Sequence, residues 1–187
     1  IDEKMERYHL HRQNKLKINY EKINISQGLK KAKNSTVCIC GLARNCIKKL
    51  HENKKVIEKI GLFFKKYKII LFENDSNDGT REFIEEWEKK NKNIILIKCD
   101  NNPRCILKNK TGYQYGQLNK KRFQKMANYR EKYLNYAKKI NYDYTMVLDF
   151  DLDFTKFNYE GFLNILSKPE IWNGVFINGR SNIPGTF

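Results

Sequence analysis

Three aspartates alternate with apolar residues where an apolar run of the chain ends: Asp149, Asp151 and Asp153. In a continuing strand, side chains two residues apart project to one side. Carboxylates held that close repel one another, and a cation between them relieves the repulsion. Because no histidine or cysteine accompanies them in the sequence, this pattern suits Mg²⁺ or Mn²⁺. A solvated strand edge, or a helix N-cap at Asp153, is the alternative interpretation.

A second polar segment, residues 73 to 80, follows an apolar run and precedes a helical pattern. Asp78 or Ser76 can cap that helix, and Gly79 permits a tight turn. Capping alone does not require three acids. Because a carboxylate just beyond a strand can accept hydrogen bonds from a base or from ribose hydroxyls, Glu73 and Asp75 are candidate nucleotide contacts.

A third segment, Gly41-Leu42-Ala43-Arg44-Asn45, joins the first apolar run to a long helical pattern. Asn45 can cap the helix, and free backbone N–H groups beside Arg44 would suit a phosphate or a base carbonyl. The glycine spacings of P-loop enzymes and of dinucleotide-binding domains are both missing, which disfavours those two classes.

Arg130 stands within a predicted apolar helical stripe. The other members of the stripe are Phe123, Met126, Ala127, Leu134 and Ala137. An unpaired buried guanidinium is costly, so Arg130 needs an anion. That anion is either a strand-end aspartate, in a structural salt bridge, or a diphosphate held beside a metal.

Short apolar runs alternate with longer helical patterns from residue 36 onward. The predicted strands are 36–41, 68–73, 93–99, 143–149 and 174–178, and the predicted helices are 46–65, 79–91, 119–140 and 158–167. Strand alternating with helix predicts an α/β fold with parallel crossovers and a sheet covered on both faces. In such sheets ligands bind beyond the carboxyl ends of the strands, where the polar segments described above lie.

The composition is that of a globular protein: 187 residues, 40% hydrophobic, with a formal charge of +16 that favours an anionic partner. No run approaches the ~20 apolar residues of a membrane-spanning helix. The cysteines, Cys38, Cys40, Cys46, Cys99 and Cys105, are odd in number and lack zinc spacing, so we predict buried free thiols. A glycosylation acceptor at Asn74 lies inside the predicted binding segment, where a glycan would obstruct it, which favours a reducing, cytoplasmic compartment.

Together these segments resemble nucleotide-sugar glycosyltransferases of the GT-A fold, a Rossmann-like fold with a central, mostly parallel sheet flanked by helices. The resemblance covers about residues 36 to 180 and rests on the order of four pieces. These are Ala43-Arg44-Asn45, the segment from Glu73 to Thr80, the helix that bears Arg130, and the Asp-x-Asp run. The charge and composition of residues 1–35 predict a basic helical extension, and the resemblance implies a nucleotide-sugar-binding domain over 36–187 with a shortened acceptor part.

The resemblance also implies roles for residues. Nucleotide contacts would come from Leu42, Ala43, Arg44, Glu73 and Asp75. Asp149 would lie at the ribose or sugar, Asp151 would bind Mn²⁺ or Mg²⁺, and Asp153 would be a second metal ligand or its support. Arg130 would lie near the donor phosphates. The implied activity is metal-dependent transfer of a hexose from a UDP- or GDP-sugar to a glycan or protein acceptor, and we assign no catalytic base, Glu170 included.

Two other functions compete with the transferase. A basic nucleic-acid-binding module or metal-dependent nuclease would use the positive charge for phosphates and the aspartates for metal. No Lys or His accompanies Asp149 to Asp153, as a nuclease would require, and we expect the tyrosines of 113–136 to pack rather than stack on bases. A catalytically inactive sugar-binding relative would keep the fold and bind no metal.

Overall fold

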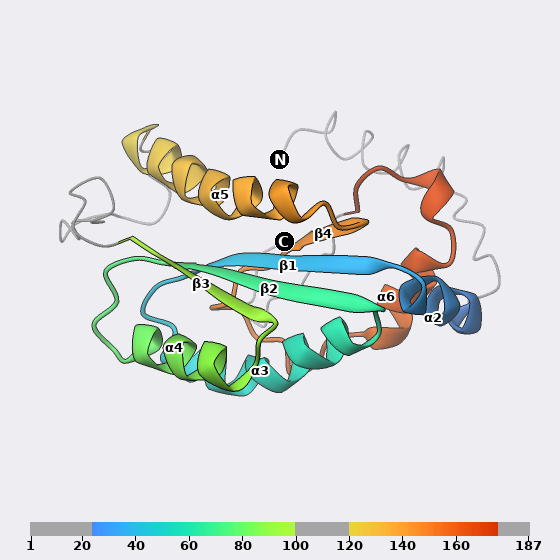
Figure 1. Ribbon diagram of the computed structural model, residues 1–187, viewed down its shortest axis with the longest axis horizontal. Coiled ribbons are helices and arrows are strands. Elements are labelled where there is room, and N and C mark those ends of the chain that lie inside the picture. The colour runs from blue at the N-terminus through green and yellow to red at the C-terminus, as the bar shows by residue number, and fades with distance from the viewer. Residues whose placement is uncertain (1–23, 100–119, 176–187) are drawn as a thin grey trace, which may run out of the picture.

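The computed structural model describes residues 24–99 and 120–175, and it forms a four-stranded sheet with helices on both faces (Figure 1). The strands are β1 (Thr36–Ala43), β2 (Lys66–Glu73), β3 (Ile94–Lys98) and β4 (Tyr144–Val147). The helices are α2 (Ile25–Lys33), α3 (Ile47–Leu62), α4 (Thr80–Lys90), α5 (Lys120–Ile140), α6 (Tyr159–Leu166) and the 3₁₀ turn η1 (Pro169–Ile171). The strand order is β3-β2-β1-β4 and every pairing is parallel, so the predicted α/β, Rossmann-like class is confirmed.

The strand register brings the predicted polar segments to one edge of the sheet. β1 and β2 run level, and their last residues, Ala43 and Glu73, are partners. β4 is shorter and its last residue, Val147, is the partner of Cys40 on β1. The chain that follows β4 therefore starts beside the final residues of β1, close to the loop that carries Arg44.

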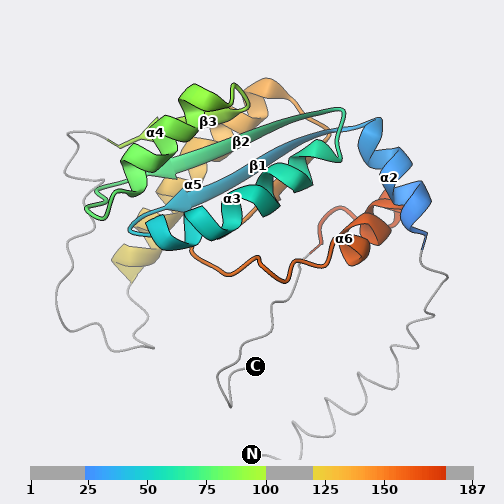
Figure 2. The same ribbon diagram turned by 90° about the horizontal axis from the view of Figure 1, so that it is seen from below.

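Two hydrophobic layers hold the sheet between its helices (Figure 2). The alternation of β1 explains both layers, because successive side chains point to opposite faces. Val37 and Ile39 join the layer that contains α3 and α4, whereas Cys38 and Cys40 join the layer beneath α5. The parallel crossovers expected from the alternation of strands and helices thus produce a sheet buried on both sides.

The buried side of α5 differs from the predicted stripe. Tyr129, Tyr133 and Ala137 are buried against the sheet, and Tyr129 stacks on Phe72 with ring centroids 5.2 Å apart. Phe123, which we placed in the stripe, is 58% exposed. The prediction chose aliphatic and phenyl side chains as the buried stripe, but two tyrosines four residues apart make the contact between α5 and the sheet. Packing was the role expected for these tyrosines, and Tyr129 and Tyr133 confirm it.

The chain before the sheet packs on α6 rather than standing free on the surface. Ala32 of α2 is fully buried, and α2 and α6 lie side by side in both views (Figures 1 and 2). Gly28 lies at their contact, where a Cβ would meet the carbonyl oxygen of Leu163 at 1.8 Å. Residues 25–33, which belong to the predicted N-terminal extension, therefore contribute to the core; residues 1–23 lie outside the described part.

The Gly28→Ala variant should lose stability, since a methyl group there requires α2 to move away from α6. Overpacking of this kind costs about 1–3 kcal/mol. For a chain of this size, each kcal/mol lowers the melting temperature by about 2–4 °C. Thermal unfolding followed by circular dichroism measures the shift; an unchanged melting temperature would contradict the close α2–α6 packing.

Two predicted strands end differently in the structure. The strand expected over 143–149 ends at Val147, and a turn begins at Phe150. Of the strand expected over 174–178, residues 174 and 175 have no strand structure and the remainder lies outside the described residues.

Three of the five cysteines are buried free thiols, as predicted: Cys38, Cys40 and Cys46. Burial raises the pKa of the Cys46 thiol to about 11, so it stays protonated at neutral pH. The prediction is wrong for Cys99, which is disulfide-bonded, and Cys105 lies outside the described residues. Among the helices the structure describes, none has the length and apolar character needed to cross a membrane.

Candidate functional site

The loops that follow β1 and β2 are bound to each other at the carboxyl edge of the sheet. The N–H of Asn45 donates to the Ser76 hydroxyl at 3.1 Å, and the N–H of Asn77 donates to Oδ1 of Asn45 at 2.9 Å. Asn45 and Asp75 have φ values of 48° and 42°, in the left-handed region that Asn and Asp tolerate better than most residues. Residues separated by 31 and 32 positions in the sequence thus form one polar unit.

The first backbone N–H groups of α3 are used by this unit. Cys46 donates to the hydroxyl of Thr80 at 2.9 Å, and Ile47 donates to Oδ2 of Asp78 at 3.1 Å. We predicted free N–H groups here for a phosphate and a cap from Asn45, and both predictions are wrong. Thr80 and Asp78 cap α3 instead, so these two N–H groups are not free for a phosphate.

Asp78 also holds its own loop, because its Oδ1 accepts from the N–H of Thr80 at 3.0 Å. Burial acts to raise the pKa of Asp78, but hydrogen bonds from Thr80 and from the Ile47 N–H outweigh it, and the pKa lies below its ordinary value. Gly79, with φ at 92°, makes the turn into α4 as the sequence predicted.

Because the folded pKa of Asp78 is lowered, its contribution to stability is present above the unfolded pKa and is lost as the pH falls through the folded pKa. We expect Asp78→Asn to be less stable than the parent at pH 7. The difference in unfolding free energy should narrow below about pH 4, the ordinary range of Asp. Urea unfolding at pH 7, 5, 4 and 3 measures it; a difference that stays constant over this range would contradict the assignment.

Glu73 is buried inside the site and bonded to protein groups. Its carboxylate is fully buried, Oε2 pairs with the Arg81 guanidinium, and Oε1 accepts from the N–H of Ser76 at 2.9 Å. A buried carboxylate with two such partners fixes the loop that carries Asp75. Ala43 is fully buried as well, whereas Leu42 is partly buried against the α5 layer. Of the five predicted nucleotide contacts, Arg44 and Asp75 are therefore the charged pair that reaches the surface.

Arg44 and Asp75 form a two-point ion pair at the mouth of the two loops. Nε of Arg44 lies 2.9 Å from Oδ1 of Asp75, and Nη2 lies 3.2 Å from Oδ2. Each side chain is 24% exposed. Two parallel hydrogen bonds to Asp75 fix the orientation of the Arg44 guanidinium plane.

The three aspartates lie in a turn. Leu148 is the last residue bonded to β1, through its N–H and the Cys40 carbonyl at 2.9 Å, and the Leu152 N–H then closes a turn onto the Asp149 carbonyl at 3.1 Å. The strand period that was expected to align the three carboxylates does not reach them, because β4 ends at Val147. Phe150 is fully buried within the turn, and Asp149, Asp151 and Asp153 are exposed.

Asp153 has local partners of its own. Its Oδ1 accepts from both the N–H and the hydroxyl of Thr155, at 2.8 and 2.6 Å, and Nζ of Lys49 lies 3.6 Å from Oδ2. Hydrogen bonds from Thr155 lower the pKa of Asp153 below its ordinary value. These bonds form a turn and not the helix N-cap that the sequence offered for Asp153, because Asn158 caps the next helix, α6. They favour a supporting role for Asp153 over direct metal binding.

Arg130 faces the start of the aspartate turn. Its Nη2 lies 3.8 Å from Oδ1 of Asp149, and its side chain is 42% exposed. The expected anion is thus a strand-end aspartate, but the guanidinium is accessible rather than buried. Burial raises the pKa of both Tyr129 and Tyr133, with a further contribution from the Asp75 charge at Tyr129 and an opposing one from Arg130 at Tyr133.

The aspartate turn does not form a closed protein cage for Mg²⁺ or Mn²⁺. No three acidic, histidine or cysteine side chains in residues 24–99 and 120–175 gather closely enough to hold a metal ion. Mg²⁺ in nucleotide sites is usually bound by one or two carboxylates together with substrate phosphates and water. The exposed carboxylate of Asp151, with Asp149 two residues before it, meets that lesser requirement.

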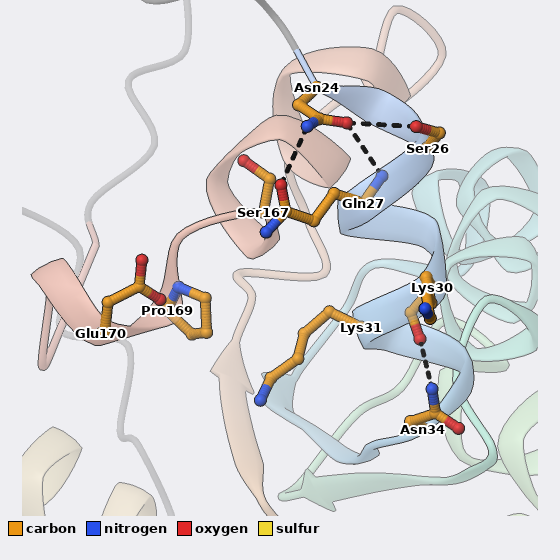
Figure 3. Close-up of a pocket in the computed structure, with 9 residues that line it drawn as sticks. All are labelled: Asn24, Ser26, Gln27, Lys30, Lys31, Asn34, Ser167, Pro169 and Glu170. Carbon is orange, nitrogen blue, oxygen red and sulfur yellow. Dashed lines mark hydrogen bonds between the residues drawn. The ribbon is translucent and has the colours of Figure 1, made fainter.

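A separate pocket lies at the opposite end of β1, between α2 and η1 (Figure 3). Its lining residues are Asn24, Ser26, Gln27, Lys30, Lys31, Asn34, Ser167, Pro169 and Glu170. Parallel sheets bind ligands at the carboxyl ends of their strands, and this pocket is at the amino end of β1. Glu170 therefore lies at the opposite end of β1 from the aspartate turn.

Comparison with known proteins adds no relative: the chain matches no protein-family model, no curated protein and no solved structure. The resemblance to GT-A glycosyltransferases therefore rests on the sequence motifs alone.

Sequence reasoning missed two residues that shape the site. Arg81, in the first turn of α4, neutralises the buried Glu73. Asn53 is fully buried on α3 and bonds to the chain around the aspartate turn. The signal for Asn53 was present, because it occupies the apolar stripe of α3 between Leu50 and Ile57, and an amide in such a stripe needs polar partners.

Proposed function

We propose that this chain binds a nucleoside-diphosphate sugar at the carboxyl edge of its sheet and transfers the sugar as a metal-dependent glycosyltransferase of the GT-A type. One observation carries the proposal. Two arginine–aspartate pairs stand beside an exposed aspartate turn at the edge where parallel sheets bind ligands: Arg44–Asp75, which is partly exposed, and Arg130–Asp149, which is about half exposed. Guanidinium and carboxylate groups recognise the two ends of such a donor, its phosphates and its hydroxyls.

The residues divide between the base and the diphosphate of the donor. Arg44 and Asp75 are held by the interlocked loops and paired with each other, and we assign this pair to the nucleoside end of the donor. Arg130 can turn from Asp149 to the diphosphate, because their 3.8 Å contact is longer than a strong hydrogen bond and both side chains are about half exposed. Asp149, once released, can accept a hydrogen bond from a ribose or sugar hydroxyl.

Asp151 would hold the divalent ion, with Asp153 keeping the turn in shape through Thr155. When bound, such an ion neutralises the diphosphate and stabilises it as a leaving group. The chain's own contribution is to fix the donor between the Arg44 and Arg130 sides of the edge. Arg130 adds positive charge where the departing diphosphate gains negative charge, which lowers the barrier.

Thermal unfolding with UDP, GDP, CMP and their sugars, each with Mn²⁺, Mg²⁺ or EDTA, tests the proposal. A ligand at about 100 times its dissociation constant adds about 2.7 kcal/mol of stability. We expect a metal-dependent rise with one nucleoside diphosphate and its sugar. No rise with any nucleotide, combined with salt-sensitive retention on DNA or RNA, would overturn the proposal in favour of the nucleic-acid-binding module.

A further inference from the structure

The aspartate turn is held from a distant part of the chain by one side chain, Asn53 of α3. Its Nδ2 donates to the carbonyl oxygens of Phe150 at 3.3 Å and Leu152 at 2.5 Å, and its Oδ1 accepts from the N–H of Phe154 at 3.0 Å. The amide is fully buried. All three bonds go to backbone groups, so they fix the path of the chain irrespective of the side chains it carries.

The two carbonyl groups that accept from Asn53 belong to the residues on either side of Asp151. The carbonyl of Phe150 lies in the peptide unit just before Asp151, and the carbonyl of Leu152 lies in the unit after Leu152. The unit between them is held by the bond from the Leu152 N–H to the Asp149 carbonyl, so the backbone around Asp151 has little freedom to rotate. Phe150 adds a second anchor, because its ring is fully buried above Gly41. The exposed Asp151 carboxylate is thereby aimed outward from a backbone that is pinned on both sides.

We propose that Asn53 is the positioning residue of the metal site: it sets the backbone around Asp151 so that the carboxylate meets a divalent ion in one orientation. The inference rests on the proposed function and adds to it a residue of α3, 98 positions away from Asp151 in the sequence. A buried amide with three backbone partners also stabilises the fold, so stability and metal affinity have to be measured separately. Outer residues that orient metal ligands change affinity by about 10–100-fold when mutated.

The test is Mn²⁺ binding to the full chain, followed by the electron paramagnetic resonance signal of free Mn²⁺, with and without UDP or GDP. Asn53→Leu keeps the branched shape of the side chain and removes all three hydrogen bonds, and Asn53→Ser keeps one hydroxyl. We expect Mn²⁺ affinity to fall by about 10–100-fold in Asn53→Leu and by less in Asn53→Ser. If Asn53→Leu does not fold, Asn53→Ser tests the inference. The expected result is a lower Mn²⁺ affinity in the folded Asn53→Ser variant.

The matched control is Ile57→Ala, which removes a fully buried side chain one turn along the same face of α3 and destabilises the same core. It should lower the melting temperature and leave Mn²⁺ affinity unchanged. Unchanged affinity in folded Asn53 variants would overturn the inference and leave the proposed function standing. Absence of Mn²⁺ binding by the parent chain, with or without nucleotide, would overturn the proposed metal site and this inference with it.

Discussion

Replacing Asp151 with asparagine is expected to abolish metal-dependent nucleotide binding while leaving the fold intact. The side chain is exposed and keeps its size, so stability should stay within about 0.5 kcal/mol of the parent. The substitution removes the charge that we assign to the divalent ion. Mutation of residues that only orient a metal ligand lowers metal affinity by about 10–100-fold, so loss of the ligand itself should lower it by at least about 100-fold.

Calorimetric titration of UDP and GDP, with Mn²⁺ and with EDTA, measures the effect of Asp151→Asn. The affinity of the variant in Mn²⁺ should fall to that of the parent in EDTA. Glu170→Gln is the control, since it removes an exposed acid at the opposite end of β1 and should bind as the parent does. Normal Mn²⁺-dependent affinity in Asp151→Asn would show that the metal assignment is wrong.

Replacing Gly41 with alanine should damage both the fold and the aspartate turn. A Cβ at this position would lie 2.3 Å from the carbonyl oxygen of Leu148 and 2.3 Å from the ring of Phe150. Neither group has room to yield, because the Leu148 N–H is bonded to Cys40 and Phe150 is fully buried. The methyl group therefore has to push the turn away from β1.

We expect Gly41→Ala to lose about 3 kcal/mol, the upper part of the range for overpacked cores. The melting temperature should fall by about 6–12 °C at about 2–4 °C per kcal/mol. Gly174→Ala is the control, because a Cβ there meets no atom within 4 Å. Thermal unfolding decides: equal melting temperatures for the two variants would contradict the packing of the turn against β1.

The strands and helices were predictable from the sequence because the local pattern and the final packing agree. β1 and β2 are apolar runs buried on both faces, and the helices between strands carry an apolar stripe of the right period. The prediction failed where a local pattern ended early. The alternation of Asp and apolar residues over 149–153 predicts a strand. In the structure Phe150 is buried in the core next to Gly41, and the chain turns there.

The candidate site was less predictable because its geometry depends on contacts between distant segments. The polar loops were found, since they follow the strands. Their mutual capping through Asp78 and Thr80 was not, because it joins residues more than thirty apart. In the same way nothing local marks Glu73 as the partner of Arg81, or Asn53 as the partner of residues about a hundred positions later.

The most direct test of the central claim is to locate Mn²⁺ by its anomalous X-ray scattering in crystals of the chain grown with Mn²⁺ and the nucleoside diphosphate that stabilises it best. We predict one Mn²⁺ within coordinating distance of the Asp151 carboxylate and of the diphosphate, with Arg130 turned from Asp149 towards the phosphates. A nucleotide bound elsewhere, such as the pocket between α2 and η1, or Mn²⁺ absent from the aspartate turn, would contradict the claim.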